Sequence, residues 1–264
     1  MISIINGVEV GYDDVGTGLP VLFAHAFPLN RTMWAPQLSA LVERCRCVAA
    51  DFRGFGETTA QGPHTMAQYA DDLAGLLDQL RIDQVVLVGC SMGGYAAFAF
   101  WSRHPKRVRA LVLADTRPGA DTDEGRARRR KLIDVARAEG ATAVANLQIA
   151  GLVGHTTRDK QPDTYDAVHR LIAQAKADAI VGALEAMMSR PDSTPLLATI
   201  TVPTLIVVGE EDALTPVAES RAMHAHIPGS RLEIIAHAGH LANLERPAAF
   251  NHLLTEFLGA FTYT

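Results

Sequence analysis

The sequence predicts an α/β fold: a mostly parallel central sheet flanked by helices, with a helical cap inserted between strands. Short β-rich runs alternate with segments of 3.6-residue periodicity, and this alternation is typical of parallel strands joined by crossover helices. A chain of 264 residues, of which 48% are hydrophobic, is long enough for one such core. The expected strands are residues 8–12, 21–25, 46–51, 85–89, 108–114, 204–209 and 231–235, and clear helices are expected at 71–80 and 247–261.

The alternation of strands and helices is interrupted once, between residues 117 and 195. This stretch has helix-like segments but no clear strand, and glycine or proline residues bound the segments. Those residues are Gly140, Gly154, Pro162 and Pro191. Helices inserted between two parallel strands would lie over the carboxyl ends of the strands. We therefore expect residues 1–116 and 196–264 to form the core, and residues 117–195 to form a helical cap, or lid.

Composition and charge exclude several classes of protein. The net charge of −5 and the isoelectric point near 6.0 argue against a nucleic-acid-binding surface. The basic run at residues 126–131 is interleaved with the pattern of an amphipathic helix, so we interpret it as a solvated helix face. No run of eighteen apolar residues is present, so we expect no membrane partner.

The cysteines and the first residues indicate a cytoplasmic protein. Cys45, Cys47 and Cys90 are an odd number, and the first two would point to the same side of one strand, too close in sequence for a useful disulfide. The N-terminal residues show no basic leader, no long apolar segment and no small-residue cleavage site. We therefore expect reduced thiols in the cytoplasm.

The most informative segment is Gly-Cys-Ser-Met-Gly at residues 89–93, which lies between an expected strand and an expected helix. A G-x-S-x-G step in this position holds its serine on a sharp, strained turn, which the glycines permit because they have no side chain between strand and helix. The hydroxyl of Ser91 would then project above the edge of the sheet. The segment predicts a serine nucleophile.

The same glycines are compatible with a dinucleotide site. Gly89, Gly93 and Gly94 open a helix, and Asp115 ends the next strand at about the spacing of a ribose-binding acid. That alternative requires the glycine turn on the first strand, whereas at least two strand-like runs come earlier here, and no Tyr-x-x-x-Lys pair follows. We expect no cofactor. No metal is expected either, because His224 and His226 lie two apart on a predicted helix and do not share a face.

A serine hydroxyl becomes a nucleophile at neutral pH only when a base takes its proton and a third group orients that base. Asp212 follows the sixth expected strand and His240 follows the seventh, so both side chains come from loops at carboxyl strand ends. The order Ser, Asp, His is the one expected for this elbow. Asp115 also follows a strand and competes with Asp212 as the acid, and His237 competes with His240 as the base.

Taken together, these motifs resemble those of the α/β-hydrolase family, over essentially the whole chain outside the insertion. The matching segments are His-Ala-Phe-Pro at 25–28, Asp-Phe-Arg-Gly-Phe-Gly at 51–56, the elbow at 89–93, residues 209–212 with 215–216, and residues 239–240 with Glu245 and Pro247. The resemblance implies a catalytic triad of Ser91, Asp212 and His240. It also implies an oxyanion hole made by the backbone N–H groups of Phe27 and Met92.

One feature departs from the family pattern, and a second limits the esters that we expect as substrates. The family usually has glycine after the first histidine, whereas this chain has Ala26, so we expect a slightly different oxyanion loop that keeps the amide of Phe27. His25 itself is interpreted as bracing that loop. A triple-glycine oxyanion loop is absent, which by resemblance disfavours esters of bulky tertiary alcohols.

The function we expect is hydrolysis of a carboxylic ester through an acyl-enzyme on Ser91. Residues 91–94 and 115–117 resemble those of small bacterial carboxylesterases and 3-oxoadipate enol-lactonases, so a lactone is the alternative substrate. A lactone with carboxylates would require a lid cation facing the serine, supplied by Arg117 or by one of residues 128–130. Further alternatives are a perhydrolase-like or haloperoxidase-like side activity, although those enzymes usually have threonine after the serine, and a non-catalytic binding protein.

Overall fold

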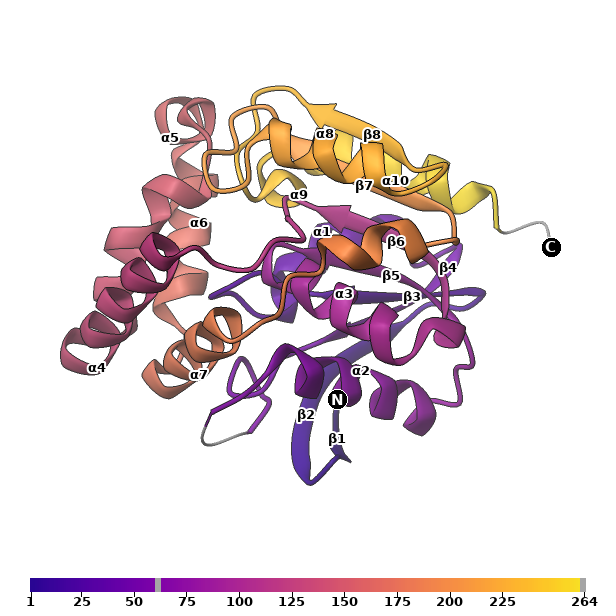
Figure 1. Cartoon of the computed structure of the whole chain (residues 1–264), viewed down its shortest axis with the longest axis horizontal. Coiled ribbons are helices and arrows are strands. Elements are labelled where there is room, and N and C mark those ends of the chain that lie inside the picture. Colours follow the sequence, from indigo (N-terminus) through magenta and orange to yellow (C-terminus); the bar gives the residue numbers. More distant parts are fainter. Residues whose placement is uncertain (60–62, 262–264) are drawn as a thin grey trace.

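The structure is a computed structural model that describes residues 1–59 and 63–261 (Figure 1). Its sheet has eight strands in the order β1-β2-β4-β3-β5-β6-β7-β8. β1 and β2 pair antiparallel, β2 pairs antiparallel with β4, and every other neighbouring pair is parallel. The strands are β1 (Ile2–Ile5), β2 (Val8–Val15), β3 (Leu19–Ala24), β4 (Cys45–Ala50), β5 (Val85–Cys90), β6 (Val108–Ala114), β7 (Thr204–Gly209) and β8 (Arg231–Ile235).

All seven predicted strands are present, and β1 is the strand that the sequence analysis missed. β1 forms a hairpin with β2 through Asn6 and Gly7, whose φ angles of 48° and 79° fit a type I′ turn. Ile2 and Ile4 are exposed on this edge strand, and only Ile5 is buried. The apolar pattern of the strand is therefore too short to show the alternation that identifies a half-buried strand.

The core lies at the centre of the parallel strands. Every residue of β5 and β7 is buried, which follows from helices covering both faces of the sheet and explains why these strands are continuous apolar runs. In Figure 1, α3 and α8 lie in front of the strands and α10 lies behind them, where it contacts α1. The helices of this part are η1 (Arg31–Trp34), α1 (Ala35–Leu41), α2 (Met66–Gln79), α3 (Met92–Arg103), η2 (Pro105–Arg107), η3 (Thr194–Thr199), α8 (Val217–His226), α9 (Ala242–Glu245) and α10 (Pro247–Gly259).

Four α-helices follow β6 before the chain returns, through η3, to the sheet at β7. They are α4 (Asp123–Leu152), α5 (His155–Lys160), α6 (Pro162–Ala173) and α7 (Ala177–Met188). α4 is kinked at Gly140, which has a φ of 78°. α4 packs against α6 and α7, and the four helices stand together at one side of the sheet, at the left of Figure 1. The predicted helical insertion between strands is confirmed.

The three cysteines are buried and free, with Cys45 and Cys47 on the same strand, β4. Within the described ranges, no helix combines the length and the apolar character that crossing a bilayer would require.

The register of the parallel strands brings several loops to one place. β3 and β6 flank β5, with Ala24 opposite Gly89 and Cys90 opposite Ala114. The segments that follow these three strands therefore begin side by side at the carboxyl edge of the sheet, where ligand sites of open α/β sheets are found.

Candidate active site

Ser91 lies on the tight turn between β5 and α3 and has a φ of 52° and a ψ of −110°. The neighbouring glycines leave room for the chain: a Cβ on Gly93 would lie 2.1 Å from the carbonyl oxygen of Ala24, and a Cβ on Gly89 would lie 2.4 Å from the carbonyl oxygen of Gly93. Thr116 holds the turn from the adjacent strand end, because its hydroxyl donates to the carbonyl oxygen of Ser91 at 2.8 Å. The positive φ is the strained geometry expected of this step.

The structure brings Ser91, His240 and Asp212 together in one hydrogen-bonded row. The Oγ of Ser91 lies 2.7 Å from Nε2 of His240, and Nδ1 of the same imidazole lies 2.8 Å from Oδ2 of Asp212. All three residues are buried. In a neutral imidazole with its proton on Nδ1, the serine hydroxyl donates to Nε2 and Nδ1 donates to the carboxylate. This is the proton arrangement in which Nε2 can accept the proton of a serine nucleophile.

Asp212 is held by Thr215, a residue of the same loop. The hydroxyl of Thr215 donates to Oδ2 at 2.6 Å, and its backbone N–H donates to Oδ1 at 2.9 Å. Burial alone would raise the pKa of Asp212, but the charge and hydrogen bond of His240 and the hydrogen bonds from Thr215 outweigh burial and hold this pKa below its usual range. Asp212 is therefore ionised at neutral pH.

The competing acid and base lie elsewhere. The carboxylate of Asp115 accepts hydrogen bonds from the backbone N–H groups of Gly209, at 2.8 Å, and Ala242, at 3.3 Å. Burial, together with the nearby charge of Asp212, raises the pKa of Asp115 well above its usual value. The side chain of His237 is 68% exposed. Asp115 thus joins β7 to the start of α9, and His237 faces solvent.

The two expected oxyanion donors follow neighbouring strands, Met92 after β5 and Phe27 after β3. Met92 is the first residue of α3, so its N–H has no acceptor within the helix and points along the positive end of the helix dipole. Phe27 follows β3, and its ring packs edge-on against Phe55 with centroids 6.5 Å apart. Phe27 lines the same cavity as Ser91.

His25 braces the segment that carries Phe27. Its Nε2 accepts a hydrogen bond from the N–H of Phe52 at 2.9 Å, so the ring proton is on Nδ1, which donates to the carbonyl oxygen of Ala26 at 2.9 Å. Burial lowers the pKa of His25, and the ring stays neutral at pH 7. The contacts agree with the bracing role expected from the sequence.

Glu245 links the His240 loop to α5, a role that the sequence analysis did not predict. One oxygen of its buried carboxylate accepts from the N–H groups of Gly239, at 2.9 Å, and Leu241, at 3.2 Å. The other accepts from the N–H of Gly154 at 2.8 Å, just before α5. A single carboxylate therefore fixes both neighbours of His240 and the start of a helix that lies far away in sequence.

Glu211 is bound by α5, whereas its neighbour Glu210 is a solvated loop charge. Glu210 is exposed, but Glu211 accepts from the backbone N–H of Thr156 at 2.8 Å and lies 2.6 Å from Nδ1 of His155. Both partners belong to α5. The tertiary packing of α5 on this loop, which no local pattern encodes, explains the difference.

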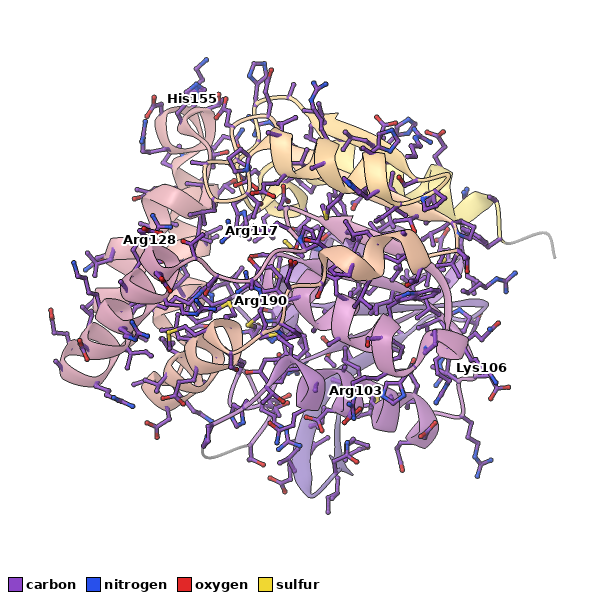
Figure 2. The ribbon with its side chains drawn as sticks, in the orientation of Figure 1. Arg103, Lys106, Arg117, Arg128, His155 and Arg190 are labelled. Carbon is purple, nitrogen blue, oxygen red and sulfur yellow. The ribbon has the colours of Figure 1, made fainter. Side chains whose placement is uncertain are left out.

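A cavity of about 290 Å³ opens beside Ser91 and His240. Its far wall comes largely from α4 and α7, and its lining is both apolar and cationic. The apolar lining includes Leu132, Leu152, Leu184 and Met187, and the charged lining comprises Arg117, Asp121, Arg128 and Arg129. Figure 2 shows Arg117 and Arg190 where the helices α4–α7 meet the sheet, with Arg128 farther out on α4.

Asp121 is the centre of a buried arginine cluster formed by Arg117, Asp121, Arg129 and Arg190. Its carboxylate lies 2.5 Å from Nε of Arg129, 2.7 Å from Nη1 of Arg190 and 3.7 Å from Nη2 of Arg117. Burial would raise the pKa of Asp121, but the hydrogen bonds and charges of Arg129 and Arg190 hold it below its usual range. The interpretation of residues 126–131 as a solvated face is therefore wrong for Arg129, which turns inward.

The arginine cluster predicts a pH-dependent stability. Because the pKa of Asp121 in the folded protein lies below its ordinary value of 3.8, its pairing stabilises the fold fully above that pH and is lost as the pH falls below it. We expect Asp121→Asn to lower the free energy of unfolding by about 3 kcal/mol at pH 7, and by clearly less at pH 3. Urea unfolding of both proteins at the two pH values measures this difference.

A matched control for that experiment is Asp123→Asn. The side chain of Asp123 is 97% exposed and pairs with Arg126 at 3.2 Å, so its loss should change the unfolding free energy by less than about 0.5 kcal/mol. A destabilisation by Asp121→Asn that stays constant or grows as the pH falls would contradict the ionised, buried pairing.

Over residues 1–59 and 63–261, no three His, Cys, Asp or Glu side chains are grouped as the ligands of a metal ion. The acidic and imidazole groups at the site are instead engaged with one another and with backbone amides, as described above for Asp212, Asp115 and Glu245.

The chain is similar to several known proteins. Residues 20–247 match the family model described as alpha/beta hydrolase fold. A thermophilic esterase from Thermogutta terrifontis, determined with malate bound, superposes with a TM-score of 0.96 at 38% identity, covering 99% of this chain and 98% of that one. An enol-lactonase from Burkholderia xenovorans superposes with a TM-score of 0.91 at 27% identity over 98% and 100% of the two chains. The 3-oxoadipate enol-lactonase 2 of Acinetobacter baylyi is 28% identical over 91% of this chain and 89% of its own length.

The family predicted from the sequence motifs is thus confirmed by a match to most of the chain. The expectation of an ester hydrolase agrees with relatives that are esterases and lactonases. The eight-stranded, mostly parallel sheet with helices on both faces agrees with the same assignment. The chain belongs to the family of proteins with the α/β-hydrolase fold.

Proposed function

We propose that the protein is a serine hydrolase that cleaves carboxylic esters through an acyl-enzyme. The observation that carries this proposal is the buried row from the Oγ of Ser91 through His240 to the carboxylate of Asp212, with separations of 2.7 and 2.8 Å. Both distances lie within hydrogen-bond reach, as nucleophile, base and orienting acid require. The row ends at a cavity large enough for a small ester.

In the first half of the reaction, the Oγ of Ser91 attacks the ester carbonyl carbon while Nε2 of His240 takes the hydroxyl proton. The tetrahedral intermediate collapses when the C–O bond to the alcohol breaks, and the imidazolium returns the proton to the departing alkoxide. In the second half, Nε2 of His240 takes a proton from a water molecule that attacks the acyl carbonyl carbon. The bond from this carbon to the Oγ of Ser91 then breaks, the imidazolium returns the proton to Oγ, and the carboxylic acid leaves. Asp212 stabilises the imidazolium in both halves and keeps the neutral ring protonated on Nδ1.

The negative charge that develops on the carbonyl oxygen needs fixed donors. The N–H of Met92 at the start of α3 and the N–H of Phe27 across the turn are the proposed pair. A single donor of this kind contributes about 10²- to 10³-fold to the rate. The neutral, doubly hydrogen-bonded ring of His25 keeps the segment of Phe27 in place without adding a charge beside the oxyanion.

The similarity to esterases and enol-lactonases supports an ester or a lactone as the substrate. We propose an ester as the first choice of substrate and a lactone as the second. The lactone is kept because the cavity wall contains the lid cations that an acidic lactone requires, namely Arg117, Arg128 and Arg129. We also propose that residues 117–195 act as the cap of the site, since α4 and α7 supply much of its lining.

A substrate panel tests the proposal. We expect p-nitrophenyl acetate and butyrate to be hydrolysed far faster by the wild type than by Ser91→Ala, with butyrate preferred over octanoate because the cavity of about 290 Å³ is small. γ-Butyrolactone and 3-oxoadipate enol-lactone complete the panel, and a preference for either lactone by orders of magnitude favours the second choice. Wild-type rates equal to those of the variant on every ester and lactone would favour a binding protein instead.

A further inference from the structure

We propose that the cavity recognises substrates that carry an ionised carboxylate in addition to the ester or lactone bond, and that Arg117 binds this carboxylate. The inference rests on the proposed function and specifies its substrate class. The charges of the cavity wall are not balanced. One carboxylate, that of Asp121, lines the cavity together with three arginines, which are Arg117, Arg128 and Arg129.

The charge of Asp121 is already matched by side chains other than Arg117. Arg129 and Arg190 reach it at 2.5 and 2.7 Å from two sides, and the side chains of Asp121 and Arg190 are only 1% and 3% exposed. Arg190 also stacks on the ring of Tyr95, 4.0 Å from its centroid, and Tyr95 lines the cavity. Two arginines therefore satisfy one carboxylate, and a third cation beside them is in excess.

Arg117 is that third cation. Its closest approach to Asp121 is 3.7 Å, beyond hydrogen-bond length, and within the described residues its buried Nε has no hydrogen-bond partner. A partly buried guanidinium with an open donor is stabilised by an anion that it can bind through two parallel N–H groups. A substrate carboxylate is such an anion.

The position of Arg117 places this charge next to the chemistry. Arg117 directly follows Thr116, whose hydroxyl donates to the carbonyl oxygen of Ser91 at 2.8 Å. Arg117 and Ser91 line the same cavity. A carboxylate on Arg117 and an ester carbonyl at Ser91 can thus belong to one small molecule.

Arg128 extends the positive charge to the mouth of the cavity. It is exposed on α4 and lines the cavity one residue before Arg129, and no ion pair joins it to any side chain in the described ranges. The nearest acidic residue one turn earlier on the helix, Glu124, is exposed. A positively charged cavity entrance raises the local concentration of a negatively charged substrate.

The test compares charged substrates with neutral molecules of the same shape. In the first pair, p-nitrophenyl hydrogen glutarate is set against p-nitrophenyl 5-methylhexanoate, in which an isopropyl group replaces the carboxylate. In the second pair the charge is in the alcohol part: 4-acetoxybutyrate is set against 4-methylpentyl acetate. We expect the wild type to have the higher kcat/KM for the charged member of at least one pair.

The variant Arg117→Gln should lower kcat/KM for that charged substrate by about 10- to 100-fold, mainly through KM, and leave its neutral partner within about twofold. Arg126→Gln is the matched control, because Arg126 lies on α4, pairs with Asp123 at 3.2 Å and does not line the cavity. Equal losses on both members of the pair would show that Arg117 acts only in packing. A wild-type preference for the neutral member of both pairs would overturn the inference.

Binding without turnover separates this inference from the proposed function. Calorimetry with glutarate on Ser91→Ala should show binding that the added Arg117→Gln change removes. If the wild type hydrolyses no ester but glutarate still binds through Arg117, the carboxylate site stands and the esterase proposal fails. If esters are hydrolysed and glutarate binds equally well without Arg117, the esterase proposal stands and the carboxylate site is refuted.

Discussion

Replacing Ser91 with alanine should lower kcat for p-nitrophenyl butyrate by on the order of 10⁶-fold, because no other group forms the acyl bond in the proposed reaction. The hydroxyl contributes little to folding. Its hydrogen bond to His240 is a single contact, and the turn itself is held by backbone contacts and by Thr116. We therefore expect the melting temperature of the variant to stay within a few degrees of the wild type. Steady-state kinetics and thermal unfolding measure the two effects.

Ser102→Ala is the matched control for this variant. Ser102 lies exposed near the end of the same helix, α3, and lines a different cavity from Ser91. Its replacement should leave kcat within about twofold of the wild type. A Ser91→Ala enzyme that keeps more than about one hundredth of the wild-type kcat would contradict a nucleophilic role, since such variants normally lose far more.

Replacing Asp212 with asparagine is expected to lower kcat by about 10⁴-fold. The amide would donate to Nδ1 of His240, which forces the ring proton onto Nε2. A protonated Nε2 cannot accept the proton of the serine hydroxyl. The hydrogen bonds from Thr215 would lose their ionised acceptor at the same time. The loss should appear in kcat at neutral pH with a smaller change in KM.

Asp115→Asn separates the two candidate acids. Its carboxylate contacts the backbone of Gly209 and Ala242 rather than His240, so we expect a lower melting temperature and a kcat within about tenfold of the wild type. Glu210→Gln, on the exposed neighbour in the Asp212 loop, serves as a surface control and should leave both quantities nearly unchanged. A 10⁴-fold loss in Asp115→Asn with an active Asp212→Asn would reverse the assignment.

Most of the sheet could be predicted from the sequence because buried parallel strands are continuous apolar runs. Residues 108–114 and 204–209 coincide with β6 and β7, because every residue of these strands except Arg109 is buried. β1 was missed because it is short and exposed on one face, although the Asn6-Gly7 turn that pairs it with β2 is the strongest short hairpin signal in a sequence.

The three side chains of the candidate site could be placed because each follows a strand directly or within a few residues. Strand order in a parallel sheet then decides which loops meet, so Ser91, Asp212 and His240 converge although they lie far apart in the sequence. No comparable sequence pattern marks the contacts that the inserted helices make. Arg190 joins Asp121 across 69 positions, and Glu211 joins Thr156 across 55, through helix packing that depends on the whole tertiary structure.

In the proposed reaction, one buried serine forms a covalent bond to the substrate, and reaction with a fluorophosphonate followed by peptide mass analysis detects such a serine. Such a reagent phosphonylates an activated serine with loss of fluoride and leaves a stable adduct. We predict one adduct per chain, located on Ser91, with ester hydrolysis lost in proportion to labelling, and much slower labelling of His240→Ala. An adduct on any other side chain, or full labelling of Ser91 without loss of hydrolysis, would contradict the account.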